Sequence, residues 1–600
     1  MSSILDQTPV AEERGATGGM AKGPPDRYQI VEKALGEARD LRIITVGAGA
    51  SGLNLAYQID KHMQQVTHVV YEKNPEVGGT WYENKYPGCA CDIPSHNYQF
   101  SWEPNPEWTN FYSSAPEILE YFKKLATKYE LYRFIKLGHK VIHAAWDGEQ
   151  AIWNVKIENV SDGSVIDDWC HFLISGSGIL NNWKWPDIPG LDSFRGQLLH
   201  SAAWDPSADW RGKSVAVLGC GSSGIQIIPT IQPGIANYFW RYSMGSIADR
   251  SLDVKKLITF IRTPTWITAG FAQSKAGPGG ANFAFSEEQK QTFRADPKAY
   301  MDYRKDIESE LNSRFKFPPQ IIKDSPEQEE AVRFTVNGMK EKLGKDSPLL
   351  KHMLPTFAVG CRRPTPGNGY LEALTKENVR VVTDTISEIV PEGIKTSTGD
   401  ILKVDMLICA TGFDISFCPR YPVIGQDGIL LGDQWKDKPE AYLSLAVPNF
   451  PNHFMFLGPN APIGHGSVLP IVEHAAKYII QMLYKCQTEG IKSVAPKQEA
   501  VADFAEHIDV FMKRTAWSTH CRSWFKNGKV DGPVVALHPG SRIHWFHMLE
   551  KPRFEDFDWQ TFGKNRFAYL GNGFSTKENP GRDTTYYFDS PYEGYRSITY

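Results

Sequence analysis

The sequence predicts an α/β protein organised around two βαβ units. The first unit is LRIITVGAGASGLNLAYQI with the following segment HVVYEK, and the second is GKSVAVLGCGSSGIQIIPTI with KLITFIR. In each unit an apolar strand runs into a glycine-rich turn that opens an amphipathic helix, which is the context expected of a dinucleotide-binding turn. The chain has 600 residues, of which 41% are hydrophobic, so it can bury the cores of several domains.

Charge and cysteine content exclude other classes of protein. The 65 basic and 69 acidic side chains leave a formal net charge of −4, which gives no basic field to hold nucleic acid. The first residues lack the basic and apolar pattern of a signal peptide, and no apolar run approaches the roughly 18 residues of a membrane span. We therefore expect a cytoplasmic protein without such a span. Nine cysteines without a CxxC pair predict reduced, mostly buried thiols, with no metal site and no dithiol redox centre.

The chain is expected to alternate between two nucleotide domains. The expected parts are an N-terminal extension at 1–40, a discontinuous FAD-binding domain at 41–195 and 396–560, an NADP-binding domain at 196–395 with a helical subdomain at about 275–350, and a C-terminal tail at 561–600. The extension ends in YQIVEKALGEARD, whose pattern predicts a short helix. Strands are expected at AIWNVKI, WCHFLISGSG, VRVVTD and VDMLICATG, and the last would return the chain to the first domain. A long helix is expected at PIVEHAAKYIIQMLYKC.

The two glycine-rich turns share one spacing, G-x-G-x-x-G. The first comprises Gly47, Gly49, Ser51 and Gly52, and the second comprises Gly219, Gly221, Ser222, Ser223 and Gly224. Glycines at these positions allow the tight turn, let the backbone approach a pyrophosphate and let the helix pack on the strand. The helix N-terminus then faces the phosphate charge. Two complete turns predict two bound dinucleotides.

The residue that ends the second strand distinguishes the two turns. Glu72 would bind ribose hydroxyls and repel a 2′-phosphate, which predicts FAD at the first turn. Arg262 suits a 2′-phosphate, which predicts NADPH at the second. Glu72 follows Gly47 by 25 residues, whereas Arg262 follows Gly219 by 43. The extra stretch near 234–251 is either a surface insertion or a gene-model artefact, and the sequence leaves both open.

Two further motifs make the resemblance to a family specific. The segment FRGQLLHSAAWD supplies Phe194, Gly196, His200, Ser201, Trp204 and Asp205. It closely resembles the type I Baeyer–Villiger monooxygenase fingerprint F-x-G-x-x-x-H-T-x-x-W-P/D, with a serine in place of the usual threonine. A second family pattern, G-G-x-W-x-x-x-x-Y-P-G-x-x-x-D, is met in full between Gly78 and Asp92. The resemblance spans about residues 41–560.

The resemblance implies a chemistry and a set of partners. Such enzymes use FAD and NADPH to insert one atom of O₂ beside the carbonyl of a small-molecule ketone, giving an ester or lactone through a C4a-peroxyflavin. An anionic oxygen must then be stabilised away from water by a fixed cation. The family position of that cation is held by Arg363, and Arg362 stands where a lysine usually contacts the 2′-phosphate.

Other roles follow from the same resemblance. Asp92 would pair with Arg363, although it could also cap a local helix. His200 would organise the interdomain linker near the nicotinamide and is a catalytic candidate with Arg363 and Asp92. For His200, a hydrogen-bonded structural role and direct chemistry are about equally open. Trp524 would lie on a loop that closes over NADP, and a core aromatic is its alternative. By resemblance, FAD also contacts Thr80, Trp81, Asp92 and Tyr98, and NADPH contacts Ser222, Ser223, Gln226 and Thr263.

Three rival functions remain at this stage. The alternative enzyme is a flavin monooxygenase that oxygenates nitrogen or sulfur; Trp204-Asp205 and Arg363 argue against it, because heteroatom oxygenation does not need a stabilised peroxide anion. A disulfide reductase would need a CxxC, and Cys89-Ala-Cys91 has the wrong spacing. A non-catalytic nucleotide sensor would not need Arg363, Asp92 or the His200 fingerprint. The particular ketone, the regioselectivity and the oligomeric state are not specified by the sequence.

Overall fold

The computed structural model describes residues 28–232, 254–313, 320–464 and 466–588. The expected insertion near 234–251 lies outside these residues. The chain divides into two units. The smaller comprises Met1–Glu37, Thr488–Gly490 and Thr561–Tyr600, and the larger comprises Ala38–Gln487 and Ile491–Gln560. Both glycine-rich turns belong to the larger unit.

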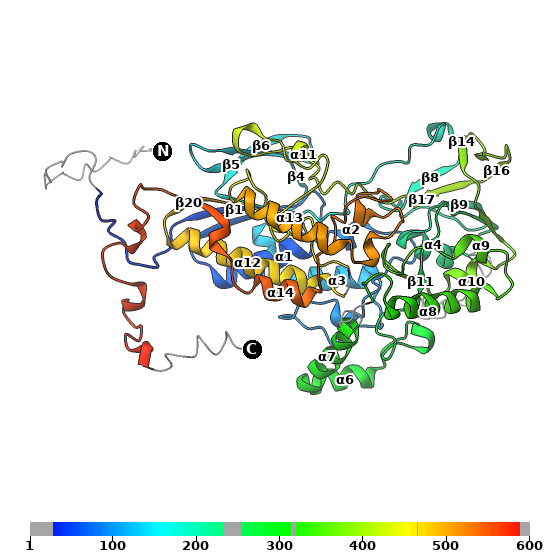
Figure 1. Ribbon diagram of the computed structural model, residues 1–600, viewed down its shortest axis with the longest axis horizontal. Coiled ribbons are helices and arrows are strands. Elements are labelled where there is room, and N and C mark those ends of the chain that lie inside the picture. Colours follow the sequence, from blue (N-terminus) through cyan, green and yellow to red (C-terminus); the bar gives the residue numbers. More distant parts are fainter. Residues whose placement is uncertain (1–27, 233–253, 314–319, 465, 589–600) are drawn as a thin grey trace, which may run out of the picture. The chain divides into compact units, whose positions relative to one another are not determined.

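The first turn lies in a parallel sheet with the strand order β19-β7-β1-β2-β3. Its strands are β1 (Leu41–Val46), β2 (Val66–Tyr71), β3 (Ile135–Lys136), β7 (Phe172–Ser175) and β19 (His453–Met455). Helix α1 (Ala50–His62) follows β1 and buries Leu53, Leu55 and Ile59. It lies beside α12 (Val468–Thr488), where the Asn54 side-chain amide donates to the Val472 carbonyl over 3.5 Å (Figure 1). The first βαβ unit and the long helix are therefore confirmed.

The second turn lies in a separate parallel sheet, in the order β13-β10-β9-β17-β8. Its strands are β8 (Gln197–His200), β9 (Ser214–Leu218), β10 (Lys256–Phe260), β13 (Val379–Val382) and β17 (Met406–Cys409). Strand β17 was expected to return the chain to the first domain, and this is wrong: Met406 pairs with Val215 of β9 and Gln197 of β8. Every residue of β17 is buried, so its uniformly apolar pattern carries no information about which sheet it joins.

Smaller sheets flank these two. A mixed sheet has the order β18-β4-β5-β6, an antiparallel sheet has the order β14-β15-β16, and β11-β12 and β20-β21 form short pairs. The strands are β4 (His139–Asp147), β5 (Ile152–Asn159), β6 (Val165–Cys170), β11 (Ile267–Thr268), β12 (Thr365–Pro366), β14 (Ile386–Val390), β15 (Gly393–Thr396), β16 (Ile401–Lys403), β18 (Val423–Ile424), β20 (Ile491–Pro496) and β21 (Phe557–Thr561). The predicted strands AIWNVKI and VRVVTD correspond to β5 and β13.

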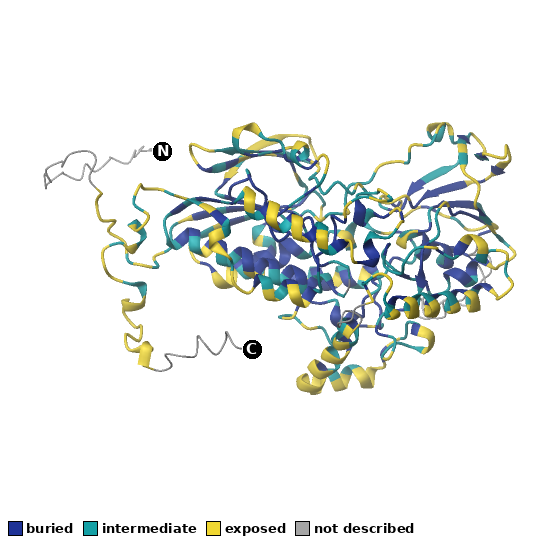
Figure 2. Ribbon diagram, viewed as in Figure 1, coloured by how far each residue is buried: buried dark blue, intermediate teal, exposed yellow. Residues whose placement is uncertain are grey.

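The described part of the charged stretch at 275–350 is mostly helical, as predicted. It contains α6 (Glu287–Ala295), α7 (Pro297–Ser313) and α8 (Pro326–Leu343). Helix α6 begins at a capping box in which Ser286 and Gln289 bond reciprocally, and it buries none of its residues, as Figure 2 shows. Helix α7 buries Tyr300, Ile307 and Leu311. The subdomain is thus attached mainly through α7 and α8.

The remaining described helices are short or peripheral to the sheets. They are α2 (Thr80–Glu83), α3 (Ala115–Lys128), α4 (Ser222–Ile231), α9 (Leu350–Met353), α10 (Tyr370–Leu374), α11 (Leu431–Gln434), α13 (Gln498–Met512) and α14 (Arg542–Leu549). Across the described ranges, no helix combines the length and the apolar character needed to cross a membrane.

The expected leading helix in YQIVEKALGEARD does not form. In the smaller unit, the Leu35 N–H donates to the Phe574 carbonyl over 2.7 Å, and the Thr576 N–H donates to the Leu35 carbonyl over 3.0 Å. Gly36 has a φ of +85°, which interrupts a right-handed helix. Extended pairing with the C-terminal segment therefore satisfies the backbone that a helix would otherwise have satisfied.

Candidate functional site

The first glycine-rich turn has the geometry of a pyrophosphate cradle. Gly47 has a φ of +101°, and a Cβ on Gly52 would overlap the Gly47 carbonyl oxygen. The Glu72 side chain is buried, and its carboxylate accepts the N–H groups of Ala48 at 2.8 Å and Asn74 at 2.9 Å. Burial raises the pKa of Glu72. The acid predicted from the strand end is therefore fixed against the turn itself.

A cavity of about 390 Å³ opens beside this turn. Its lining includes the predicted residues Gly47, Gly49, Glu72, Thr80, Arg363 and Trp524. Sequence reasoning missed other lining residues, among them Lys73, Asn74, Lys140, Val141, Ser175, Asp414 and Arg420. Several of these follow the carboxyl ends of β2, β7 and β17, which is where ligands of open α/β sheets bind. The acidic strand end, the glycine turn and the cavity beside them fit a flavin dinucleotide.

The second turn repeats the cradle. Gly219 has a φ of +113°, and a Cβ on Gly224 would overlap the Gly219 carbonyl oxygen. A Cβ on Gly221 would meet nothing within 4 Å, so there is open space directly over this turn. Ser222 is the first residue of α4, which places free helix N–H groups toward that space. The arrangement fits a second pyrophosphate.

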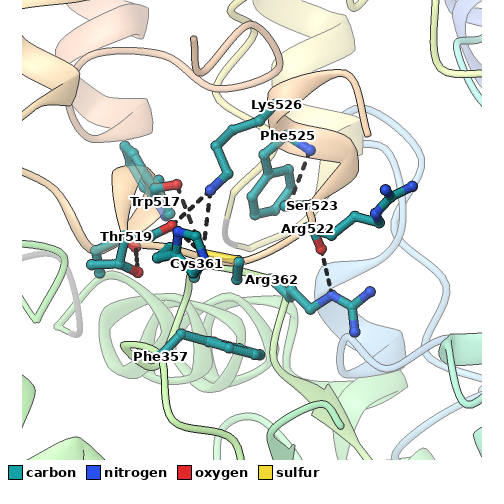
Figure 3. Close-up of a disulfide and its surroundings, with 12 residues drawn as sticks. Phe357, Cys361, Arg362, Trp517, Thr519, Arg522, Ser523, Phe525 and Lys526 are labelled. Atoms are coloured by element: carbon teal, nitrogen blue, oxygen red, sulfur yellow. Dashed lines mark hydrogen bonds between the residues drawn. A yellow bond between two sulfur atoms is a disulfide. The ribbon is translucent and has the colours of Figure 1, made fainter. Parts of the chain in front are cut away.

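Three arginines gather near the end of β10. Arg362 donates to the carbonyl of Pro264 at 3.2 Å. It also donates to the carbonyl of Arg522 at 2.8 Å (Figure 3). Burial, followed by the nearby charges of Arg262 and Arg522, lowers the pKa of Arg362. Within the described ranges, none of the three guanidinium groups has a carboxylate partner. Mutually repelling cations without acidic partners fit a bound phosphate, as expected for the 2′-phosphate of NADPH.

Arg522 is a site residue that the sequence reasoning missed. It lies two residues before Trp524 in CRSWFK, so its position beside that residue was the available signal. The Thr263 carbonyl accepts a hydrogen bond from Arg362 Nη1 at 3.4 Å, and its predicted contact with NADPH stays a prediction. The guanidinium cluster is thus built from three distant segments of the chain.

Arg363 and Asp92 form the predicted ion pair. The Arg363 Nη2 donates to Asp92 Oδ1 over 2.9 Å, and Nη1 donates to Oδ2, so the contact is bidentate. Burial lowers the pKa of Arg363 and the Asp92 carboxylate raises it, and the net shift is upward. The guanidinium also lies over the Phe271 ring, 5.8 Å from its centroid. The pair therefore holds a permanent cation in one orientation.

A second cavity of about 390 Å³ meets the first at Arg363. Arg363 and Ile463 line both cavities. The second cavity is otherwise lined by α7, α8 and the loops around 463–466 and 517–525, with apolar side chains that include Phe271, Leu311, Ile321, Trp517 and Phe525. Gly458 lines the first cavity, and Gly464 and Gly466 line the second. Arg363 thus lies where the two cavities meet.

Other predicted residues brace the site. The Trp81 indole N–H donates to the Tyr98 hydroxyl over 3.1 Å. Gln226 of α4 accepts the Tyr86 hydroxyl at 2.8 Å and donates to the Ala90 carbonyl at 2.9 Å. Gln226 therefore connects the helix of the second turn to the Gly78–Asp92 motif. Its amide is engaged within the protein, so its predicted contact with NADPH stays a prediction.

His200 is buried at the end of β8 and outside the linings of both cavities. Its Nδ1 accepts the Ala202 N–H at 3.1 Å, which places the ring proton on Nε2, 3.2 Å from the Thr411 hydroxyl. The ring stacks on Trp183 with centroids 4.5 Å apart. Burial lowers the pKa of His200 to about 4, so the ring is neutral at neutral pH. These contacts support the linker-organising role over direct chemistry.

The expectation of reduced thiols alone is wrong. Cys361 and Cys521 form a disulfide, with their Cα atoms 6.4 Å apart and 160 residues between them in sequence (Figure 3). The other seven cysteines are free, and six of them are buried. A pairing between residues this distant depends on the packing of two loops, which no local spacing reveals.

Comparison with known proteins gives a consistent result. A family model for an NAD(P)-binding Rossmann-like domain matches residues 45–115. The FAD-binding monooxygenase tazF of Aspergillus terreus is 42% identical over 543 residues, 89% of this chain and 92% of that relative. A Baeyer–Villiger monooxygenase of Pseudomonas aeruginosa is 33% identical over 508 residues, 84% of this chain and 88% of the relative. The structure of cyclohexanone monooxygenase from Rhodococcus sp. Phi1 bound to NADP⁺ matches with a TM-score of 0.73 at 26% identity, covering 88% of this chain and 100% of that one.

Proposed function

This chain belongs to the family of type I Baeyer–Villiger-like flavoprotein monooxygenases, and from that premise we propose that it converts a ketone to an ester or lactone with one atom of O₂. FAD and NADPH are its cofactors. The first cradle, with Glu72, would hold FAD, and the second, with the cluster of Arg262, Arg362 and Arg522, would hold NADPH. When bound, reduced flavin supplies the activated oxygen.

One observation carries the proposal: Arg363 lines both the cavity beside the first glycine-rich turn and the second, adjoining cavity. A fixed cation at such a junction can stabilise negative charge on an oxygen that moves from one space to the other. Asp92 holds the guanidinium by two hydrogen bonds, so no reorganisation is needed when the charge develops. Heteroatom oxygenation has no need for this cation.

The second cavity would receive the ketone. Its lining combines aromatic and aliphatic side chains with the polar Gln273, Glu310, Gln320 and Glu330. A ketone held against the apolar side chains would displace water from Arg363, which would strengthen the field of the guanidinium on the carbonyl oxygen. Gln226 keeps the two nucleotide halves in register through Tyr86 and Ala90. His200, neutral and hydrogen-bonded to Thr411, would fix the linker beside the second sheet.

The test is product analysis with the flavin-loaded enzyme. NADPH oxidation would be followed with linear, cyclic and polycyclic ketones, and with a sulfide and a tertiary amine as heteroatom substrates. We expect an NADPH-dependent product one oxygen atom heavier than a ketone. Sulfoxide or N-oxide formation with no ester from any ketone would contradict the proposal and support the heteroatom oxygenase.

Two variants make the test specific. Arg363→Ala should retain flavin and oxidise NADPH but lose ester formation by about 100-fold or more, the usual effect of removing a transition-state donor. Arg380→Ala, which removes an exposed arginine of β13, is the matched control and should leave the rate unchanged. Unimpaired ester formation in Arg363→Ala would overturn the assignment.

A further inference from the structure

The Cys361–Cys521 disulfide joins two loops that carry the nucleotide-contacting arginines. Cys361 directly precedes Arg362 and Arg363, and Cys521 directly precedes Arg522. The same loop continues to Trp524, which lines the cavity beside the first glycine-rich turn. Figure 3 shows the cross-link between these loops, with the side chain of Arg362 reaching the carbonyl of Arg522. The disulfide therefore lies next to two of the three arginines of the guanidinium cluster, Arg362 and Arg522.

The position of Arg362 depends on this junction. Its Nε donates to the Arg522 carbonyl over 2.8 Å, and its Nη1 donates to the Pro264 carbonyl over 3.2 Å. Arg362 is thus hydrogen-bonded both to the cross-linked loop and to the segment that follows β10. If the loop of Cys521 moved away, Arg362 would lose its shortest hydrogen bond, and the cluster would lose Arg522 as well.

A buried lysine, Lys526, is hydrogen-bonded to backbone carbonyls of the loop that carries Cys521. Lys526 has no solvent exposure, and its ammonium group donates to the Thr519 carbonyl over 2.7 Å and to the Val530 carbonyl. It lies 3.8 Å from Cys361 Sγ, and the Thr519 carbonyl oxygen lies 3.1 Å from the same sulfur. A cation and a hydrogen-bond acceptor beside Cys361 can accommodate both a thiolate and a thiol there. The surroundings of Cys361 thus suit the reduced state as well as the disulfide.

The two sulfurs differ in access. Cys361 is fully buried and Cys521 is 4% exposed, but Cys521 lies between the exposed residues His520 and Arg522. A small movement of this loop would therefore uncover Cys521 first. The loop that would have to move is the one that carries Arg522 and Trp524. The loop that must move to admit a reductant to Cys521 is therefore the same loop that contributes Arg522 to the NADPH site.

We propose that the Cys361–Cys521 disulfide is a dithiol-sensitive cross-link that positions Arg362 and Arg522 for the 2′-phosphate of NADPH, so that its reduction weakens NADPH binding and leaves flavin binding intact. This rests on the assignment of NADPH to the second cradle made above. The cysteines act through the arginines and are positioning residues.

A dithiol reduces the Cys361–Cys521 bond by thiol–disulfide exchange in two steps. A thiolate of the dithiol attacks Cys521 Sγ and forms a mixed disulfide there, while the Cys361–Cys521 bond breaks and its electron pair leaves on Cys361 Sγ, which takes up a proton. The second thiol of the reagent then displaces Cys521. The protein gains two thiols, and the dithiol becomes its cyclic disulfide.

The experiment measures nucleotide binding and thiols in the flavin-loaded protein. Dithiothreitol should raise the free thiols of the unfolded chain from seven to nine. We expect NADP⁺ to bind about tenfold more weakly to the reduced wild type and to Cys521→Ser, with NAD⁺ affinity and flavin content unchanged. Dithiothreitol should have no further effect on Cys521→Ser, and Cys170→Ala, which removes a buried free thiol of β6, should retain the wild-type NADP⁺ affinity and its response to dithiothreitol.

Several results would overturn the proposal. Nine free thiols in the untreated protein would mean that the cross-link does not form. Equal weakening of NADP⁺ and NAD⁺ would indicate a merely structural bond, because only NADP⁺ carries the 2′-phosphate. None of these readouts requires a ketone, so they remain informative if the proposed oxygenation fails. If Cys521→Ser does not fold, reversible reduction of the wild type still provides the comparison.

Linkage supplies a second measurement. If reduction weakens NADP⁺ binding tenfold, saturating NADP⁺ must favour the disulfide over the dithiol by the same factor. A tenfold change in this two-electron equilibrium corresponds to about 30 mV. Titration against dithiothreitol redox buffers with and without NADP⁺ should show this displacement toward the disulfide, and coincident titrations would contradict the coupling.

Discussion

The two dinucleotide cradles have the same backbone geometry but differ in where their charged residues lie in the chain. Both begin at a glycine of positive φ, and in both a Cβ on the third glycine would overlap the carbonyl of the first. In the first cradle the charged residue, Glu72, is buried and hydrogen-bonded to the turn that it serves. In the second, the charge comes from Arg262, Arg362 and Arg522, on three separate segments.

The difference shows how one turn can be used for two ligands. A ribose hydroxyl needs a single acceptor, which the local backbone can hold in place. A 2′-phosphate is a dianion, and several guanidinium groups brought together for it repel each other when it is absent. The first site is therefore largely preformed by local structure, while the second depends on loops held by long-range contacts.

The strongest test of this comparison places the same substitution in both turns. Gly52→Ala should abolish stable FAD binding, with flavin content below about a tenth of wild type, because its Cβ would overlap the Gly47 carbonyl. Gly224→Ala should retain flavin and lose NADP⁺ binding by about 100-fold. Flavin absorbance and NADP⁺ titration measure both effects. Gly338→Ala, in open space within α8, is the control and should bind both normally; a reversed pattern would exchange the two cofactor assignments.

Removing the strand-end arginine should have the next largest effect. Arg262→Ala should weaken NADPH binding by about 10- to 100-fold, the value of a charge-assisted hydrogen bond to phosphate, and leave NADH binding unchanged. The ratio of kcat/KM for the two nucleotides measures this directly. A parallel loss for NADH would mean that Arg262 supports the fold rather than the 2′-phosphate.

The contribution of His200, in the linker between the two sheets, to the free energy of unfolding should depend on pH. Burial lowers the pKa of His200 from its ordinary 6.5 to about 4, so folding favours the neutral ring. This contribution is fully present above pH 6.5 and is lost as the pH falls toward 4. Urea unfolding at fixed free FAD should show the wild type losing about 2–3 kcal/mol more than His200→Asn over that interval. The exposed His62 at the end of α1 offers the control His62→Gln, and parallel curves for wild type and His200→Asn would contradict the assignment.

The smallest expected effect concerns Arg522. Arg522→Ala keeps the backbone carbonyl that holds Arg362 but removes an exposed guanidinium. NADPH binding should weaken by only about threefold, and the loss should shrink at high salt because an exposed charge is screened. Titrations at low and high ionic strength measure it. A loss as large as that of Arg262→Ala would place the phosphate closer to Arg522.

Local patterns were sufficient for the parts of the fold whose information is local. The two strand–turn–helix units, the long helix at 468–488 and the helical stretch at 275–350 were predicted because their periodicity and glycine spacing lie within short windows. The same holds for Glu72, which is fixed by its own turn. The pairing of Asp92 with Arg363 came from a family resemblance, since nothing in the sequence between them brings them together.

Tertiary structure decided the features that depend on distant segments. Strand β17 is apolar on both faces, so only packing could place it beside β8 and β9 rather than in the first sheet. The segment at 28–40 had a helical pattern, but pairing with residues 574–576 and the positive φ of Gly36 override it. The Cys361–Cys521 bond, the arginine cluster and the junction of two cavities at Arg363 likewise arise from loops far apart in sequence. By itself the sequence determined two nucleotide cradles and their opposite charges; which loops complete the second one is set by long-range packing, because contacts between distant segments leave no periodic trace in the chain.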